Sequence, residues 1–122
     1  MTSVRDLPTR PAGRRRRSTP VVLLVGASAQ LLERCRRLVC EGVELVECDL
    51  PTLAGTAAWV MPQAIILTEA VRSSEPEAFT EVARRVGAEL VVLPSEDVSD
   101  PELTARVTTA LDLAQRSRLG SG

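Results

Sequence analysis

The stretch VVLLVGASAQ, residues 21–30, joins an unbroken apolar run to the start of a helix, and this junction decides the fold. An apolar run without alternation is typical of a parallel strand that helices cover on both faces. Ser28 can cap the helix that follows, in which apolar residues recur at helical spacing. Gly42 then supplies the left-handed residue at which such a helix ends. The stretch therefore predicts a strand-turn-helix unit of an α/β protein.

The same alternation of strand and helix repeats along the chain outward from this unit. Three more strands are predicted from apolar or alternating runs, at residues 43–48, 63–68 and 89–94. Helices are predicted to begin at Thr52, at Ser74 in a capping box with Glu77, and at Asp100 before Pro101. Because a helix joins each pair of successive strands, the sheet is predicted to be parallel with right-handed crossovers. The fold class is α/β, a small three-layer parallel sheet with flanking helices.

Composition excludes several kinds of chemistry. The 122 residues include no histidine and no tyrosine, and all 15 basic residues are arginines. Without histidine there is no histidine-activated nucleophile and no ordinary zinc site, and without lysine there is no Schiff base or phosphate-loop lysine. Trp59 and Phe79 are the two aromatic residues, and both are expected in the core, although an exposed Trp59 would be an anchor for a partner. We therefore predict that the chain is not an enzyme and binds no cofactor or metal.

The three cysteines are Cys35, Cys40 and Cys48. Their odd number and their spacing fit neither a disulfide framework nor a paired redox motif. They are interpreted as small buried apolar residues in a reducing compartment, so a cytoplasmic location is expected. The longest apolar run is far too short to span a bilayer, and no transmembrane segment is predicted.

Charge divides the chain into a basic arm and an acidic globule. Residues 1–20 carry six arginines against one aspartate, a net +5, whereas residues 21–122 carry nine arginines against fifteen acids, a net −6. With three prolines and few apolar residues, the arm 1–20 is predicted to be disordered, followed by an α/β domain at 21–118 and a flexible tail at 119–122.

Within the arm, a run of four arginines is the strongest charge cluster: Arg14, Arg15, Arg16 and Arg17. One interpretation is a solvated tail, and another is electrostatic contact with nucleic acid, an anionic surface or an acidic partner. Without neighbouring aromatic residues, nucleic-acid binding would depend on phosphate contacts and fall steeply with salt. A rival interpretation takes residues 1–29 as a twin-arginine export signal, whose cleavage would remove the strand at 21–25.

Three segments resemble the receiver domain of two-component response regulators. VVLLVGAS (21–28), PQAIILTEA (62–70) and DPELTARVTTAL (100–111) are similar to the first strand, third strand and last helix of that flavodoxin-like family. The resemblance covers residues 21 to about 118. It places the family's magnesium-binding acids on Gly26 and Ala27 and its phosphate-accepting aspartate on Thr68. None of the three is an acid, so the resemblance implies a degenerate receiver that is not phosphorylated.

Two acids remain near the expected carboxyl ends of the strands, Asp49 and Glu69. Holding Mg²⁺ beside a phosphate requires several oxygen ligands at one place. Glu69 follows Thr68 directly, and adjacent residues of a continuing strand point to opposite faces. An active phosphate receiver that uses either acid is therefore the third-ranked hypothesis.

The segment between the last predicted strand and the last helix is short. Only SEDVS, residues 95–99, lies there, where the resembling family has a further helix and strand. Deletion of that unit leaves about four strands in the order 2-1-3-4, with the strand at 89–94 as an open edge. An open edge beside apolar helix surface favours pairing with a partner or a second copy. The predicted partner-binding residues are Leu90, Val92, Leu103 and Val107.

These observations favour a non-catalytic protein-interaction or scaffold module that resembles a pseudo-receiver domain, in bacterial signalling or protein localisation. A homodimer is one expected form, and the identity of a protein partner stays open. The alternative function is nucleic-acid or chromosome-associated binding through the arginine-rich arm at 1–20.

Overall fold

The structure is a computed structural model that describes residues 20–39 and 42–121. The arm before residue 20, with its four consecutive arginines, and Cys40 lie outside these residues. The described elements, in chain order, are β1 (Val21–Val25), α2 (Ala29–Val39), β2 (Glu44–Cys48), the 3-10 helix η1 (Leu50–Thr52), α3 (Leu53–Val60), β3 (Ala64–Thr68), α4 (Glu69–Ser74), α5 (Pro76–Val86), β4 (Glu89–Leu93) and α6 (Asp100–Ser121).

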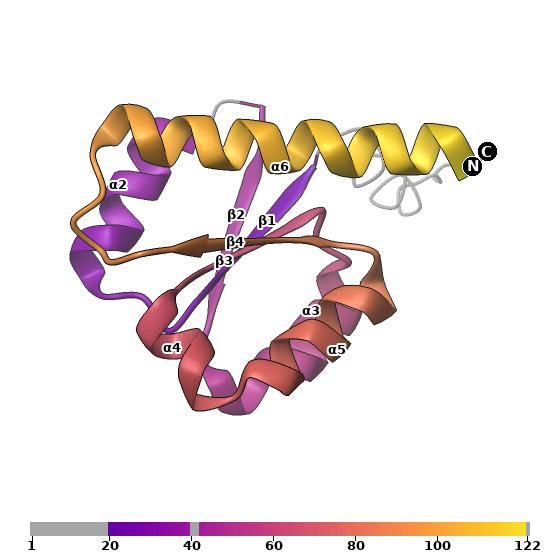
Figure 1. Ribbon diagram of the computed structural model, residues 1–122, viewed down its shortest axis with the longest axis horizontal. Helices are drawn as coiled ribbons and strands as arrows, with labels where there is room; N and C mark the ends of the chain where they lie inside the picture. Colours follow the sequence, from indigo (N-terminus) through magenta and orange to yellow (C-terminus); the bar gives the residue numbers. More distant parts are fainter. Residues whose placement is uncertain (1–19, 40–41, 122) are drawn as a thin grey trace, which may run out of the picture.

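The four strands form one parallel sheet in the order β2-β1-β3-β4 (Figure 1). This flavodoxin-like arrangement confirms the predicted fold class and strand order. β1 and β3 occupy the centre and are buried along their whole lengths, whereas β2 and β4 are the two edges. Removal of residues 1–29 would therefore take a central strand out of the sheet.

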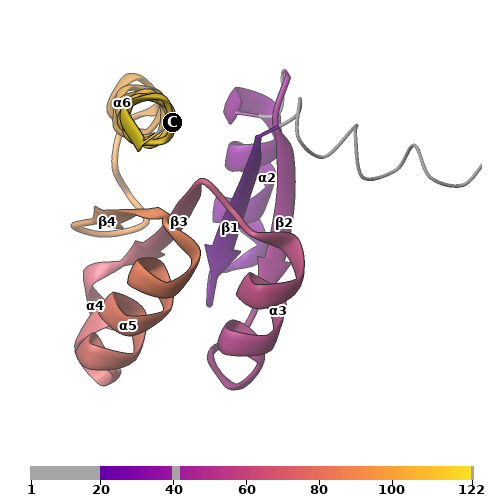
Figure 2. The same cartoon turned by 90° about the vertical axis from the view of Figure 1, so that its right-hand side faces the viewer.

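Helices cover both faces of the sheet and divide its core in two. α2 and α6 lie on one side, and α3, α4 and α5 lie on the other (Figures 1 and 2). Alternate side chains of β1 point to opposite sides, so Val22 and Leu24 join the core under α2 and α6, whereas Leu23 and Val25 join the other. Burial on both faces explains why β1 has no polar residue.

Two helix starts differ from the sequence-based expectation in the side chain that caps them: α5 begins after Glu75 with no side-chain cap, because the Ser74 hydroxyl donates to the carbonyl of Val71 instead. The capping box predicted at Ser74 is wrong: the Thr68 hydroxyl caps α4 directly after β3, so Ser74 already lies at the end of that helix. Asp49, rather than Thr52, supplies the capping side chain before η1 and α3.

The last helix also differs at both ends. The Ser99 hydroxyl accepts the N–H of Glu102 at the start of α6, because the carboxylate of Asp100 is bound by Arg34. At the other end, the helix continues through residue 121, into the segment that was expected to be a tail. No proline interrupts the chain after Pro101, so nothing in the backbone forces an earlier end.

Trp59 is exposed, contrary to the expectation that it lies in the core. Its side chain is 83 % exposed, whereas Leu53 and Ala57 of the same helix are buried. Residues two positions apart lie on opposite sides of a helix, so α3 cannot bury both Ala57 and Trp59 against one sheet face. Phe79, by contrast, is fully buried as predicted.

A single guanidinium holds the short connection between β4 and α6 in place. Arg34 of α2 donates to the carbonyl oxygens of Glu96, at 2.8 Å, and of Val98, and it forms a 2.8 Å ion pair with Asp100. The Val98 side chain is buried in the core beneath α2 and α6. Arg34 therefore joins the short connection to α2 at three groups, the carbonyls of Glu96 and Val98 and the carboxylate of Asp100.

Replacing Arg34 with methionine keeps most of the aliphatic stem and removes these contacts. We expect Arg34→Met to lower the free energy of unfolding by about 2–3 kcal/mol, because partly buried carbonyl and carboxylate groups lose a charged donor. The matched control is Arg36→Met, an exposed position on the same helix, where a change within about 0.5 kcal/mol is expected. Urea denaturation measures both variants, and equal effects would contradict the assigned role of Arg34.

Candidate functional site

Two regions of the fold could carry function. The first is the carboxyl rim, which we define as the turns that follow the carboxyl ends of the strands, including residues 26–28, 49, 68–69 and 94–97. Open parallel sheets usually bind ligands at this end. The second is the free edge of β4, next to α6.

At the rim, the turn after β1 is packed against an apolar side chain. Gly26 has a φ of 63°, a conformation that favours glycine, and its N–H donates to the carbonyl of Cys48 at 3.0 Å. A Cβ atom placed on Gly26 would lie 3.3 Å from a methyl group of Val71. The neighbouring Ala27 is half-buried against the core. Where the resemblance puts two metal-binding acids, the structure has close apolar packing.

The position of the family's phosphate acceptor has a structural role. Thr68 is buried, with 7 % of its surface exposed, and its hydroxyl accepts the N–H of Val71 at 3.4 Å. This contact begins α4, the short helix that carries Val71 over Gly26. Both Gly26 and Thr68 thus contact the same residue, Val71, which lies in the first turn of α4 and packs against Gly26.

The start of α2 is occupied by a carboxylate of the chain itself. Glu96 accepts hydrogen bonds from the N–H of Ser28, at 3.1 Å, and from the Ser28 hydroxyl. The hydroxyl also accepts the N–H of Leu31 at 3.2 Å, which confirms Ser28 as a capping residue. Free N–H groups at a helix start are the usual binding place for a phosphate, and here Glu96 already provides the negative charge.

The remaining rim acids bind their own segments. Asp49 accepts the hydroxyl of Thr52 at 2.8 Å, and Glu69 contacts Arg72 at 3.3 Å and Ser73 at 3.2 Å. Within residues 20–39 and 42–121, no three His, Cys, Asp or Glu side chains come together in a way that could hold a metal ion. The rim offers capping contacts and internal ion pairs, and the described residues do not assemble the oxygen cluster that Mg²⁺ requires.

The two described cysteines are poorly suited to nucleophilic chemistry. Burial raises the pKa of the Cys35 thiol to about 11, although nearby Arg34 acts in the opposite direction. Burial also raises the pKa of Cys48, opposed by a hydrogen bond with Thr52. Because the thiolate is the reactive form, both groups are largely unreactive at neutral pH. Their position agrees with the interpretation of Cys35 as a core residue.

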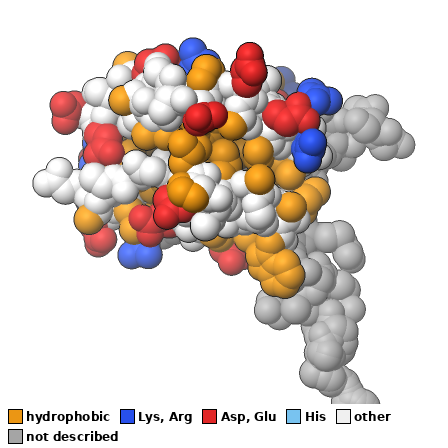
Figure 3. Space-filling view, turned by 90° about the horizontal axis from the view of Figure 1, so that it is seen from below, with side chains coloured by type: hydrophobic (Ala, Val, Ile, Leu, Met, Phe, Trp, Pro, Cys, Tyr) orange, Lys and Arg blue, Asp and Glu red, His pale blue; other side chains and the backbone are white. Residues whose placement is uncertain are grey.

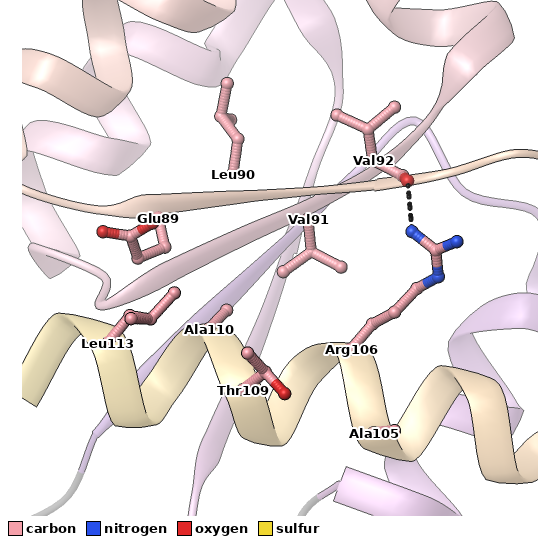
Figure 4. A pocket seen from close by; sticks show the side chains of 9 residues that line it. All are labelled: Glu89, Leu90, Val91, Val92, Ala105, Arg106, Thr109, Ala110 and Leu113. Atoms are coloured by element: carbon pink, nitrogen blue, oxygen red, sulfur yellow. Dashed lines mark hydrogen bonds between the residues drawn. The ribbon is translucent and has the colours of Figure 1, made fainter.

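The β4 edge forms the second candidate region. An open groove of about 320 Å³ runs between β4 and α6, which we call the β4–α6 groove (Figure 4). Its lining is mainly aliphatic, with Glu89 near one end and Arg106 near the other, and Arg106 donates to the carbonyl of Val92 at 3.3 Å. The groove combines exposed strand backbone, apolar side chains and one charge of each sign.

Two of the four predicted partner-binding residues lie at this groove and two do not. Leu90 and Val92 of β4 line it and are half-buried. Leu103 and Val107 of α6 are fully buried against the sheet, so their assignment to a partner surface is corrected. These two belong to the apolar stripe by which α6 packs on its own domain, and a stripe at helical spacing is core in most helices.

The groove face of α6 was missed by sequence reasoning. It is formed by Ala105, Thr109 and Leu113, which recur every four residues, and all three are exposed. Leu113 is 45 % exposed, an unusual fraction for a large aliphatic side chain. The signal in the sequence was weak because a small residue, a threonine and a leucine do not form a clear apolar stripe.

A further apolar groove lies on the opposite side of the sheet. Viewed from below, apolar side chains gather in the middle of the face that carries α3, α4 and α5 (Figure 3). The groove is lined by residues of η1, α3 and α5, with Glu75 as its charged member. Ligand sites usually combine several polar groups with an apolar wall, and this groove offers little to orient a small molecule.

Comparisons with known proteins do not identify the chain. No protein-family model matches the sequence, and no curated protein matches it. Among the described residues, no helix is both long enough and apolar enough to cross a bilayer. The geometry of the rim and of the β4–α6 groove is therefore the basis for assigning a function.

The ion pair between Arg34 and Asp100 makes stability depend on pH. The hydrogen bond from Arg34 holds the pKa of Asp100 below its ordinary value of 3.8. The folded state therefore binds this proton less readily than the unfolded state does. The resulting stability is fully present above the ordinary pKa and is lost as the pH falls through the lower folded value.

Asp100→Asn keeps an oxygen acceptor and removes the charge. We expect the wild type to be more stable than this variant between about pH 5 and pH 8, with a constant difference that shrinks below about pH 4. Chemical denaturation across this pH range measures the difference. Because Asp100 is solvent-accessible, the effect should weaken in high salt. Parallel stability curves down to the acid limit would contradict the role of the carboxylate.

Proposed function

We propose that the chain is a non-catalytic protein-interaction or scaffold module, resembling a pseudo-receiver domain that is not phosphorylated, and that it binds its partners through the β4–α6 groove. The observation that carries this proposal is a strand edge that no other strand of the described residues pairs with, beside an exposed helix face in a sheet whose two faces are covered. Bacterial signalling or protein localisation is the setting in which such a module fits best.

The two edges of the sheet differ in how they are protected. β2 presents two exposed glutamates, Glu44 and Glu47, and charges on an edge strand oppose pairing with another chain. β4 has a single charge at its first residue, Glu89, followed by four aliphatic residues. Of the two edges, β4 is therefore the one suited to accept an additional strand.

The state of the rim supports a non-catalytic role. Val71 packs against Gly26, Thr68 caps α4, and Glu96 occupies the start of α2. Each group that the resemblance would assign to phosphate chemistry is engaged in holding the fold together. Because these rim groups are already engaged, we assign recognition through surface contacts to the β4–α6 groove.

Two adjacent threonines of α6 provide a matched test of this groove. Thr109 lines it and Thr108 does not, although both side chains are exposed. We expect Thr109→Glu to remove partners retained by the wild type in affinity capture, because a bound partner would then desolvate a carboxylate in a groove lined by Val91 and Leu113. Thr108→Glu should retain the same partners, and the melting temperatures of both variants should stay close to that of the wild type. Capture of one identical set by all three proteins would overturn the proposal.

A second candidate function rests on the charge of the first 20 residues. Their net charge of +5, on a chain that is otherwise acidic, favours electrostatic binding to nucleic acid. The globule by itself carries a net −6 and would be repelled by phosphates.

Removal of residues 1–19 should abolish binding to generic duplex DNA if the arm is responsible. Replacing Arg14, Arg15, Arg16 and Arg17 with glutamine should weaken binding and reduce the slope of log affinity against log salt by up to about four, roughly one for each lost phosphate contact. Fluorescence anisotropy with a labelled duplex at several salt concentrations measures both effects. Unchanged affinity after removal of the arm would end this hypothesis.

A further inference from the structure

We infer that the occupant of the β4–α6 groove is a second copy of the same chain, joined by antiparallel pairing of β4 with β4 about a two-fold axis at Val91. The inference rests on the proposed function of the groove as an interaction surface, and it adds the identity of the partner, the strand register and the charges that select it.

The backbone of β4 has two residues whose polar groups face outward. The N–H of Glu89 donates to the carbonyl of Gln63 at 3.0 Å, so Glu89 faces β3, and the direction alternates along a strand. Leu90 and Val92 therefore direct their N–H and C=O groups away from the sheet. The contact between Arg106 and the carbonyl of Val92 lies on this outer side and agrees with the assignment.

The residues on either side of this pair restrict the register. The N–H of Ala88 is already bonded to the carbonyl of Ala83 at 2.9 Å, and Pro94 has no N–H to donate. Antiparallel pairing with Leu90 opposite Val92 of the second copy uses both available donors in each chain, giving four hydrogen bonds about a two-fold axis at Val91. A shift of two residues in either direction would pair half of these donors with the carbonyl of Ala88 or Pro94, both of which lie outside β4.

The charges of the groove are self-complementary in the same register. Glu89 and Arg106 lie toward opposite ends of the groove (Figure 4). A two-fold axis at Val91 exchanges these ends, so Arg106 beside Val92 of one copy faces Glu89, next to Leu90, of the other. The contact occurs twice in the dimer, as symmetry requires.

In the single chain, the side chains of Arg106 and Glu89 remain available for this contact between copies. Arg106 is held by Glu102 of its own helix at 2.8 Å and is 41 % exposed. No basic group among the described residues lies within ion-pair distance of Glu89. An extended segment of an unrelated protein would form the same backbone bonds without these reciprocal charges, and the observations therefore favour a second copy.

The exposed face of α6 completes the surface. In a continuous sheet the two α6 helices lie on the same side, next to the two-fold axis. The small side chains of Ala105 and Thr109 allow them to approach closely, and Leu113 gains a contact that it lacks in a single chain.

Charge reversal on the full chain tests the pairing. Sedimentation equilibrium over a range of protein concentrations should give a dimer for the wild type. Arg106→Glu and Glu89→Arg should each raise the dissociation constant by about tenfold or more, since each creates two like-charge contacts, and the double variant should recover most of the loss. Glu102→Gln, which removes only the intrachain partner of Arg106, should not weaken the dimer.

Cysteine pairing tests the register independently. Facing residues of a hydrogen-bonded antiparallel pair have Cα atoms about 5.5 Å apart, within the range of a disulfide. A mixture of Leu90→Cys and Val92→Cys chains should therefore form a disulfide-linked dimer under mild oxidation. Each variant alone should link poorly, because its own copies lie about 7–8 Å apart on the diagonal. The unsubstituted chain controls for the native cysteines.

The outcomes separate this inference from the proposal on which it rests. A wild type that stays monomeric at all concentrations, while Thr109→Glu still loses captured partners, overturns the homodimer and leaves the interaction surface standing. A monomer with captured partners that ignore Thr109→Glu overturns both. A dimer without charge rescue, or one that links Leu90→Cys to itself, overturns the pairing described.

Discussion

The central strands β1 and β3 are buried on both faces, so two layers of helices must cover the sheet. α2 is too short to cover one face alone, and the 22-residue α6 crosses the rest of it. The position of α6 in turn depends on the short connection after β4, which Arg34 binds to α2. The helices thereby cover both faces, while no strand within residues 20–39 and 42–121 pairs with the outer edge of β4.

The rim and the β4 edge differ in how many of their polar groups already have hydrogen-bond partners. At the rim, Ser28, Thr68 and Glu96 satisfy one another or nearby backbone groups, and Val71 fills the space beside Gly26. At the edge, the outward groups of Leu90 and Val92 have a single contact among the described residues, the one from Arg106. Polar groups that are already bonded gain little from a ligand, whereas unpaired strand backbone gains hydrogen bonds from a new strand.

Much of the fold was predictable because it follows from local spacing. The burial of β1 and the cap at Ser28 depend on an apolar run and a short polar residue that can be seen in the sequence, and helical connections indicated a parallel sheet, whereas the order of the strands was implied by the resemblance. Contacts between distant segments were not predictable in this way. Asp100 does not cap α6 because Arg34, 66 residues away, holds its carboxylate.

The site was predicted less completely for a similar reason. The open edge and the residues Leu90 and Val92 followed from the shortness of the segment 95–99. Which side of α6 faces that edge depends on the rotation of the helix about its axis. The stripe containing Leu103 and Val107 was assigned to the partner surface, but the sheet buries it, and the smaller side chains of Ala105 and Thr109 face the groove instead.

The glutamates of β2 limit how large an assembly of this domain can become. A sheet extended through β4 has a β2 strand at each outer end, and Glu44 and Glu47 discourage addition there. Growth by strand addition would therefore stop at an eight-stranded sheet, formed from four strands of each chain, with a charged β2 strand at each end. The unequal edges thus favour a closed complex of defined size over a fibre.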